Sequence, residues 1–314
     1  MTGRTAIGID LGGTKVAGIV MEEGGRILAR DERPTPEGDG EAVLDAVHAS
    51  VAALAGRAQP VAVGVGAAGL VDFAAGALPF APNLPLREVP IRDRVSERTG
   101  LPCVVDNDAN AAAWGEFLFG AGRGARHLLL VTVGTGIGGG IIWDGELYRG
   151  AHGFAAEIGH VIVEPGGPVC GCGNRGCWEQ VASGRALDRL GRDEANRDPN
   201  GAIARLAAGE EVRGEHVAEA ARQGDAAATA IVEEVGRRLG EGMAGLVNIL
   251  DPELIVVGGG VAEEGELILG PARRAYAEAV EAPEHRPPVS IETARLGNDA
   301  GAIGAAALAL DLGR

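Results

Sequence analysis

Three of the chain's four cysteines, Cys170, Cys172 and Cys177, lie within eight positions. This spacing is too tight for two unstrained disulfides, and it lacks the C-x-x-C pattern that is usual for redox pairs. His160 lies ten residues upstream and would complete a Cys₃His set, which is a recognised tetrahedral zinc site. Because protein ligands would fill all four positions, the predicted Zn²⁺ is structural. The fourth cysteine, Cys103, lies in the apolar run LPCVVD and is predicted to be a core residue.

A cluster of carboxylates and amides occupies the segment VVDNDANAAAWGE, residues 104–116. Asn107 and Asp108 stand where a buried strand is predicted to give way to a helix. Either residue could cap the helix, since Asn and Asp are both preferred at that position. An Asp beside an Asn can also act as a general base toward a hydroxyl that the amide holds, as kinases do. One cap suffices, and Asp106 and Asn110 enlarge the cluster, so the residues alone leave capping and catalysis both open.

Three glycine-rich turns follow predicted strands: DLGGTK at 10–15, VGTGIGGG at 133–140 and VVGGGV at 256–261. The first two join strand to strand, which excludes the P-loop and the Rossmann fingerprint, because both need a helix after the turn. A lone Gly-Gly turn can be an ordinary hairpin, but such turns can also direct backbone N–H groups and a Thr hydroxyl at phosphate oxygens. As a set, the three turns favour nucleotide binding. The predicted nucleotide contacts are Gly12, Gly13, Thr14, Lys15, Gly134, Thr135, Gly136, Gly138, Gly258, Gly259 and Gly260.

Two charged residues flank the first of these turns. Asp10 ends a predicted strand, where it suits a Mg²⁺ ligand, direct or through water; a turn residue of the Asx type is the alternative. Lys15 is the only lysine among 28 basic residues. This exception indicates that a compact ammonium is required there rather than a planar guanidinium.

The elements that must hold these residues follow one pattern twice. The first thirty residues predict three strands, at 5–11, 14–21 and 25–32, separated by glycine turns. Residues 126–150 repeat the order of strand, glycine turn, strand, Asp-Gly turn and strand. Helical and strand-like segments follow each set, so the sequence predicts two α/β domains of one plan.

The expected boundaries of these domains follow from the repeat. A smaller N-terminal lobe would comprise residues 1–120 and 299–314, and a larger C-terminal lobe residues 121–298. The cysteine-containing segment 151–184 is predicted as a zinc-binding insertion in the larger lobe. No linker is rich in proline or serine, so a compact hinge is expected between the lobes.

The composition and charge of the chain argue against some classes of binding partner and some cellular locations. The chain has 314 residues, 46% of them hydrophobic, which supports real cores. Its formal net charge of −16 argues against a nucleic-acid or anionic-membrane partner. There is no apolar run of about 18 residues and no signal-peptide pattern at the start. We therefore expect a soluble, cytoplasmic protein without disulfides.

The motifs together resemble those of the ROK family (repressors, open reading frames and sugar kinases) of the actin-like, hexokinase-type ATPases. The match spans the whole chain and runs in order through DLGGTK, NDANAAAWGE, VGTGIGGG, AAEIGH and CGCGNRGCWEQVASG. Within this family, CWEQVASGRAL looks most like the bacterial ATP-dependent glucokinases. The resemblance implies a two-domain α/β fold with a cleft between the lobes.

It also implies transfer of the γ-phosphoryl group of MgATP to the 6-hydroxyl of glucose, with Asp108 as the catalytic base. The sugar-binding residues that it implies are Asn83, Asn107, Asp108, Glu157, His160 and Glu179. His160 would have two roles, with one ring nitrogen on zinc and the other toward the sugar, since one bond fixes the tautomer for the other. Relatives suggest a homo-oligomer, either a dimer or a tetramer.

Two loops depart from the family pattern. Residues 66–69 read GAAG where Gly-x-Pro-Gly is common, and Leu86-Arg87 replaces a frequent Gly-Trp after PNLP. Because both loops line the sugar pocket in the family, other hexoses remain alternatives: N-acetylmannosamine, N-acetylglucosamine, mannose or fructose. Polyphosphate as donor is a further alternative, although such relatives generally lack the cysteine cluster. A sugar-sensing repressor is disfavoured, because the first strand is expected at about Thr5 with no helix-turn-helix before it.

Overall fold

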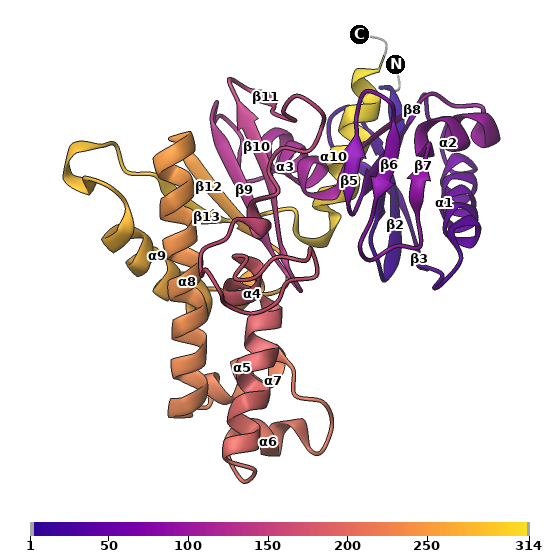
Figure 1. Cartoon of the computed structure of the whole chain (residues 1–314). Coiled ribbons are helices and arrows are strands. Elements are labelled where there is room, and N and C mark those ends of the chain that lie inside the picture. Colours follow the sequence, from indigo (N-terminus) through magenta and orange to yellow (C-terminus); the bar gives the residue numbers. More distant parts are fainter. Residues whose placement is uncertain (1–2, 313–314) are drawn as a thin grey trace. The chain divides into compact units, whose positions relative to one another are not determined.

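The computed structural model describes residues 3–312 and divides into two compact units (Figure 1). Unit 1 comprises Met1–Leu130, Gly139–Ala156 and Ala294–Arg314, and unit 2 comprises Val131–Gly138 and Glu157–Thr293. Among residues 3–312, no helix combines the length and the apolar character needed to cross a bilayer.

Unit 1 is built on a five-stranded sheet with the strand order β3–β2–β1–β4–β8. Its first three strands form an antiparallel meander, as the sequence predicts, and β4 and β8 extend the sheet in parallel with β1. The strands are β1 (Thr5–Leu11), β2 (Lys15–Glu22), β3 (Ile27–Pro34), β4 (Val63–Ala67) and β8 (Cys103–Asn107).

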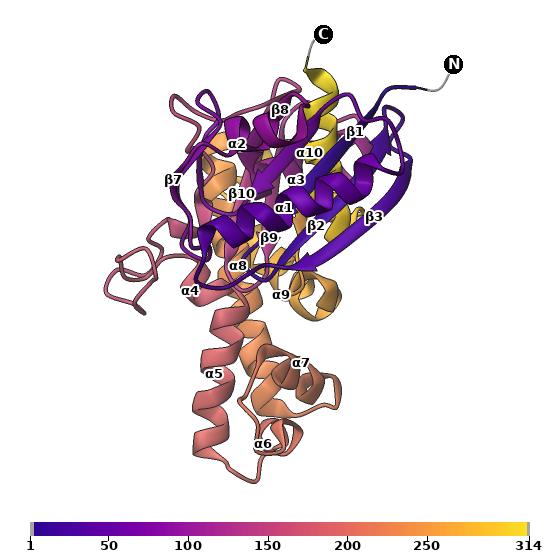
Figure 2. The same cartoon turned by 90° about the vertical axis from the view of Figure 1, so that its right-hand side faces the viewer.

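Helices cover both faces of this sheet (Figure 2). On one face, Ile7 and Ile9 of β1 join a core with the apolar side of α1 (Gly40–Ala55). On the other face, α10 (Ala300–Asp311) lies so close that a Cβ at Gly8 would be 1.9 Å from the carbonyl oxygen of Ala302. The period-2 alternation of β1 therefore places Asp10 on the α10 face, because it shares that face with Gly8.

The remaining elements of unit 1 surround these layers. A small sheet, β5–β6–β7, follows β4, and α3 packs against α10. The elements are β5 (Leu70–Asp72), β6 (Ala77–Phe80), β7 (Arg87–Val89), α2 (Ile91–Thr99) and α3 (Asp108–Phe119).

A second five-stranded sheet has the order β11–β10–β9–β12–β13, and the division into units passes through β9 and β10. Its first three strands repeat the order of strand, glycine turn, strand, turn and strand found at the N-terminus, as predicted from the sequence, with an Asp-Gly turn between the second and third strands. The strands are β9 (Leu128–Val133), β10 (Ile137–Trp143), β11 (Glu146–Leu147), β12 (Leu254–Gly258) and β13 (Ser290–Thr293).

The helices of unit 2 are dominated by the long α8 (Ala226–Leu250), which packs along α9 (Glu266–Ala279). Small residues allow this approach, since a Cβ at Gly240 would lie 2.1 Å from the carbonyl oxygen of Ala272. The other helices of the unit, visible beside α8 in Figure 1, are α4 (Glu179–Ala182), α5 (Gly184–Arg197), α6 (Ala202–Ala207) and α7 (Gly214–Arg222).

Candidate functional site

The first glycine turn, turn 1 (residues 12–14), joins β1 to β2 in unit 1. The Gly12 N–H donates to the carbonyl oxygen of Lys15, which closes a tight turn and leaves Thr14 exposed. A Cβ at Gly13 would lie 2.9 Å from the carbonyl oxygen of Asn83, so only glycine fits between the turn and the predicted sugar-binding loop. The ammonium of Lys15 lies 3.2 Å from the Glu32 carboxylate in an exposed ion pair, which a phosphate could replace.

Asp10 stands one residue before the end of β1, against the first turn of α10. A Cβ at Gly301 would lie 2.9 Å from the Asp10 carboxylate, so glycine at that helical position makes room for it. Burial, followed by repulsion from Asp108, raises the pKa of Asp10 to about 7, although the charge of Lys15 opposes this shift. A divalent cation would stabilise the charged form of the buried Asp10 carboxylate and would reduce its repulsion from Asp108. Asp10 is therefore suited to bind such a cation.

The junction between β8 and α3 separates the two roles that the sequence left open. Asn107 is the N-cap: its Oδ1 accepts from the N–H groups of Ala109 and Asn110, at 2.9 and 3.1 Å. Its Nδ2 donates to the carbonyl oxygen of Gly69 at 3.0 Å. Asp108, the first residue of α3, is therefore not needed as the cap.

The Asp108 carboxylate keeps one oxygen available. Its Oδ1 accepts from the Ala109 N–H at 2.9 Å, and within residues 3–312 no other residue donates a hydrogen bond to this carboxylate. Burial raises the pKa of Asp108, although hydrogen bonds from the backbone N–H groups of Ala109 and of Asp108 itself oppose the rise. A carboxylate with a raised pKa and a free oxygen has the properties required of a general base.

The two departures from the family pattern have structural explanations in unit 1. Ala68 stands where the family has proline, and its N–H, which proline would lack, donates to the carbonyl oxygen of Leu11 at 3.1 Å. Arg87 binds the loop around Asn83 by donating through Nη1 to the carbonyl oxygens of Ala81, Leu84 and Leu86. Arg87 therefore orders this loop, and Asn83 itself is exposed.

The second glycine turn, turn 2 (residues 134–136), joins β9 to β10 and belongs to unit 2. A Cβ at Gly136 would lie 2.4 Å from Oε2 of Glu179, one of the predicted sugar ligands. Ser183, which is fully buried, donates through Oγ to the carbonyl oxygen of Thr135 at 2.9 Å. The Gly184 N–H donates to the carbonyl oxygen of Gly134 at 2.8 Å. The segment that follows the cysteines thus supports turn 2.

The other glycines predicted to contact the nucleotide lie close to turn 2. Gly138 follows it in β10, and Gly258 is the last residue of β12. Gly259 has a φ of 87°, and a Cβ there would lie 2.6 Å from the carbonyl oxygen of Val133. Gly260 comes next and is exposed. The third predicted turn therefore packs against the strand end from which turn 2 begins.

Two further predicted sugar ligands flank a short 3₁₀ helix, Ile158–His160. Glu157 is its N-cap residue and is exposed, and the His160 N–H donates to the Glu157 carbonyl oxygen at 3.1 Å. A Cβ at Gly159 would lie 2.1 Å from the carbonyl oxygen of Ile137, so this helix packs directly on the start of β10. In unit 2, Glu157, His160 and Glu179 are thus all placed next to turn 2 or the strand that it begins.

The predicted metal ligands come together. One ligand atom from each of His160, Cys170, Cys172 and Cys177 lies within 4.8 Å of the others, and all the cysteines are free thiols. The Cys172–Cys177 sulfur separation and the distance from Cys170 Sγ to His160 Nδ1 are both 3.6 Å. These separations fit a tetrahedron with metal–ligand bonds of about 2.0–2.3 Å. The donor set therefore fits Zn²⁺, with Nε2 of His160 left for another partner.

The metal cluster and Glu179 are in contact. Glu179 Oε1 accepts from the Cys170 thiol at 3.1 Å and from Gln180 Nε2 at 3.0 Å. Trp178, next to the last cysteine, is 1% exposed and donates through its indole N–H to the Arg238 carbonyl oxygen. The segment that carries the cluster is thus anchored on α8, and Glu179 lies next to the cluster.

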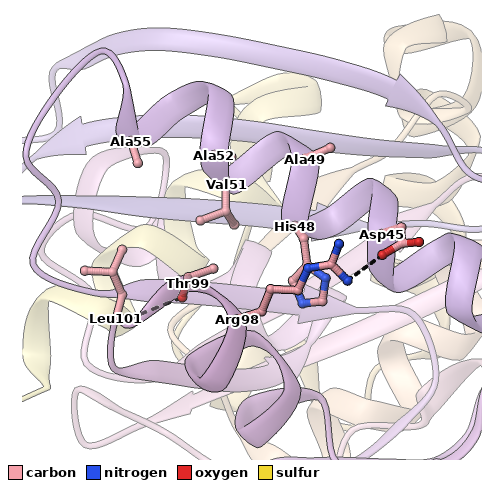
Figure 3. Close-up of a pocket in the computed structure, with 9 residues that line it drawn as sticks. All are labelled: Asp45, His48, Ala49, Val51, Ala52, Ala55, Arg98, Thr99 and Leu101. Carbon is pink, nitrogen blue, oxygen red and sulfur yellow. Dashed lines mark hydrogen bonds and ion pairs between the residues drawn. The ribbon is translucent and has the colours of Figure 1, made fainter.

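A separate pocket of about 370 Å³ lies between α1 and the end of α2 (Figure 3). Asp45 and Arg98 form an ion pair of 2.6 Å at this pocket, and His48 lies in its wall. None of the residues predicted from the sequence to bind sugar, nucleotide or metal lines it.

Some residues around the site carried no signal of their own in the sequence. Ser183 supports turn 2, Arg87 orders the loop of Asn83, and Arg149 forms an ion pair with Asp106. Ser183 falls within the motif CGCGNRGCWEQVASG, and Arg87 lies where the loop after PNLP departs from the family pattern. Arg149 lies 43 positions from its partner, and nothing in its neighbourhood identifies the pairing.

Comparisons with known proteins agree with this geometry. A family model described as ROK family matches residues 6–312. The glucokinases of Streptomyces coelicolor and Thermotoga maritima are 46% and 38% identical to the chain, each over 96% of both chains. The crystal structure of a ROK family glucokinase from Streptomyces griseus, in complex with glucose and AMPPNP, aligns with a TM-score of 0.89 and 47% identity. It covers 98% of this chain and 99% of that one. The predicted two-domain α/β fold is confirmed, and the chain belongs to the ROK family.

Proposed function

We propose that this protein is a glucokinase, which transfers the γ-phosphoryl group of ATP to the 6-hydroxyl of glucose. The observation that carries the proposal is that Asn107 and Asp108 have separate roles at the β8–α3 junction. Asn107 caps the helix, so the partly buried Asp108 keeps one carboxylate oxygen free for the acceptor hydroxyl. The near full-length similarity to glucokinases supports glucose as acceptor and ATP as donor.

In this reaction, Asp108 accepts the proton of the 6-hydroxyl as the sugar oxygen forms its bond to the γ-phosphorus. The bond from the γ-phosphorus to the bridging oxygen breaks, and ADP leaves. The raised pKa of Asp108 makes it a stronger base than an ordinary carboxylate, provided that it is ionised. In unit 1, Asn83 and Asn107 would hold sugar hydroxyls, and in unit 2 Glu157, Nε2 of His160 and Glu179 would do so.

Two metal ions have separate places in the proposal. Asp10 would hold the Mg²⁺ of MgATP, directly or through water, while turns 1 and 2 bind phosphate oxygens through backbone N–H groups. Mg²⁺ neutralises charge that develops on the phosphates. Zn²⁺ would be held by His160, Cys170, Cys172 and Cys177, where it has a structural role only, since no ligand position stays open.

Asp108→Asn tests the proposed base. The amide keeps the shape of the side chain but cannot accept the proton, so kcat should fall by a factor of about 10²–10⁴ while glucose still binds. The measurement is a coupled assay of ADP formation, with glucose affinity from calorimetry. Asp93→Asn, an exposed carboxylate on α2, is the matched control and should behave as wild type. An unchanged kcat in Asp108→Asn would remove Asp108 from the role of base.

A panel of acceptors and donors tests the substrates. Glucose should have the highest kcat/KM among glucose, mannose, fructose, N-acetylglucosamine and N-acetylmannosamine, and ATP should be used in preference to polyphosphate. A higher kcat/KM for another hexose would reassign the acceptor without changing the chemistry.

The proposal extends to the setting of the enzyme. Four cysteines that form no disulfide within residues 3–312, together with a dependence on ATP, suit the cytoplasm. The sequence-based lobes, 1–120 with 299–314 and 121–298, would each carry part of the machinery. A homo-oligomer, dimer or tetramer, is the expected assembly, and light scattering coupled to gel filtration would measure it.

A further inference from the structure

A buried ion pair in unit 1 adjoins the proposed acceptor residues. Arg149 Nε donates to Asp106 Oδ2 at 2.7 Å, and the Asp106 side chain is 2% exposed. We propose that Arg149 is a positioning residue for the phosphoryl acceptor, which acts by fixing the Asp106 carboxylate next to Asn107 and Asp108. This inference rests on the proposed function, because it concerns the same acceptor site.

The first argument is what Asp106 does with its other oxygen. Its Oδ1 accepts from the backbone N–H of Asn107 at 2.8 Å and from the Asn110 Nδ2 at 3.0 Å. These two donors lie on either side of Asp108 in the chain. The orientation of one carboxylate therefore sets the path of the backbone through Asn107 and the first turn of α3.

The second argument is how Arg149 itself is held. Its guanidinium lies 3.8 Å from the centre of the Phe73 ring, so one edge binds Asp106 while one face stacks on an aromatic ring. Lysine would keep the charge but not the stacking, because an ammonium has no planar face to lay on the ring. Arg149 is thus fixed in two directions.

The third argument is where the chain goes after Arg149. A Cβ at Gly153 would lie 2.5 Å from the carbonyl oxygen of Val71, so this part of the chain packs tightly along β5. The segment that follows Arg149 is therefore itself packed within unit 1, which limits the movement of the guanidinium beside Asp106.

A purely structural ion pair is the competing explanation, and a double-mutant cycle separates the two. Arg149→Met keeps the length of the side chain but leaves the buried Asp106 carboxylate without its cation, which is strongly destabilising. Asp106→Asn keeps an oxygen for the donors of Asn107 and Asn110. The double variant carries neither charge, so the folding penalty of an unpaired buried carboxylate disappears.

The experiment measures the melting temperature, kcat, and the KM values for glucose and ATP in all four proteins. Arg149→Met should melt at lower temperature, and its kcat/KM for glucose should fall about tenfold or more, with the KM for ATP within about twofold of wild type. The double variant should regain the melting temperature but not the kcat/KM for glucose. Arg98→Met, which breaks the exposed pair with Asp45, is the control and should match wild type.

Three results of the cycle would overturn the inference. A wild-type kcat/KM in Arg149→Met, or its recovery in the double variant, would make the pair merely structural. An equal rise in the KM for ATP would show a general loss of structure. If wild type prefers another hexose, the cycle is read with that sugar, so the proposed acceptor can fail while the inference stands. A wild type without kinase activity would overturn both.

Discussion

Turns 1 and 2 share a plan and differ in what surrounds them. Each joins two strands, each contains glycines and an exposed threonine, and each lies close to one proposed sugar ligand. Turn 1 approaches the backbone of Asn83, whereas turn 2 approaches the carboxylate end of Glu179. A repeated strand–turn–strand segment has thus been placed twice next to residues proposed for the sugar.

The difference lies in charge and support. One residue before its last position, β1 carries Asp10, while β9 carries the neutral Thr132 at the corresponding place. Turn 2 instead is braced by Ser183 and Gly184, which follow the metal cluster in the chain. Both turns therefore offer backbone N–H donors. Only turn 1 has a carboxylate that could bind a cation, and only turn 2 is supported by the segment that follows the metal cluster.

Among the changes that test this comparison of the two turns, Asp10→Asn should have the largest effect, and it should act on activity and stability in opposite directions. Loss of the proposed Mg²⁺ ligand should lower kcat/KM by a factor of about 10²–10³. Thr132→Val, the corresponding change in β9, should lower it far less. Coupled assays at several Mg²⁺ concentrations make this comparison, and equal losses in the two variants would contradict the asymmetry between the turns.

The stability effect of the same substitution follows from the raised pKa of Asp10, about 7. Between pH 4 and 7 the folded protein holds a proton that the unfolded chain releases, so wild-type stability falls as pH rises through this range. Asn removes this penalty, which is at most about 4 kcal/mol above pH 7 and vanishes near pH 4. Urea unfolding at pH 4.5 and pH 8 measures it; a variant less stable than wild type at pH 8 would be the contrary result.

Loss of the metal should have the next-largest effect, and this effect should act through residues of unit 2. Protein dialysed without chelator should hold about one zinc per chain, and Cys172→Ser should lose it, melt earlier and show a KM for glucose raised by a factor of about 10–100. The physical reason is that the metal would fix Cys177, which lies two residues before Glu179 at the start of α4. Metal analysis and thermal melts are the measurements.

Cys103→Ala is the matched control for this prediction. Cys103 is buried in β8, and burial raises the pKa of its thiol to about 12, so it should bind no metal. Its zinc content should stay at the wild-type value. Full zinc retention in Cys172→Ser would exclude the proposed cluster.

Much of this molecule could be predicted from short stretches of sequence, because the residues that identify its strands and metal ligands lie close together along the chain. Alternation identified β1 to β3, the repeat identified β9 to β11, and ligand spacing brought His160 to the cysteines, all of which the structure reproduces. The choice between capping and catalysis at residues 107 and 108 needed the structure, since either side chain can cap a helix. There the geometry assigns the cap to Asn107.

What the sequence could not predict depends on contacts between distant segments. The fully buried Glu116 accepts from the backbone N–H groups of Arg295 and Leu296, about 180 positions away. The N–H of Ala68 compensates for a missing proline only because Leu11 lies opposite. Such partners have no signature in residue type or spacing, because backbone groups are present at every position.

Paired glycine substitutions should have the smallest effects and test the turns directly. Gly13→Ala directs a methyl group at the carbonyl oxygen of Asn83, which cannot rotate away, so it should lower the melting temperature and kcat/KM together. Gly136→Ala directs its methyl at Oε2 of Glu179, a flexible side-chain end that can move. It should therefore keep the melting temperature and raise the KM for glucose, by about tenfold at most.

Gly245→Ala, on α8 with no atom within 4 Å of the added Cβ, controls for the substitution itself. If Gly136→Ala destabilised the fold as much as Gly13→Ala, the contrast between a backbone neighbour and a side-chain neighbour would be wrong. If Gly136→Ala raised only the KM for ATP, turn 2 would serve the nucleotide without affecting the position of Glu179.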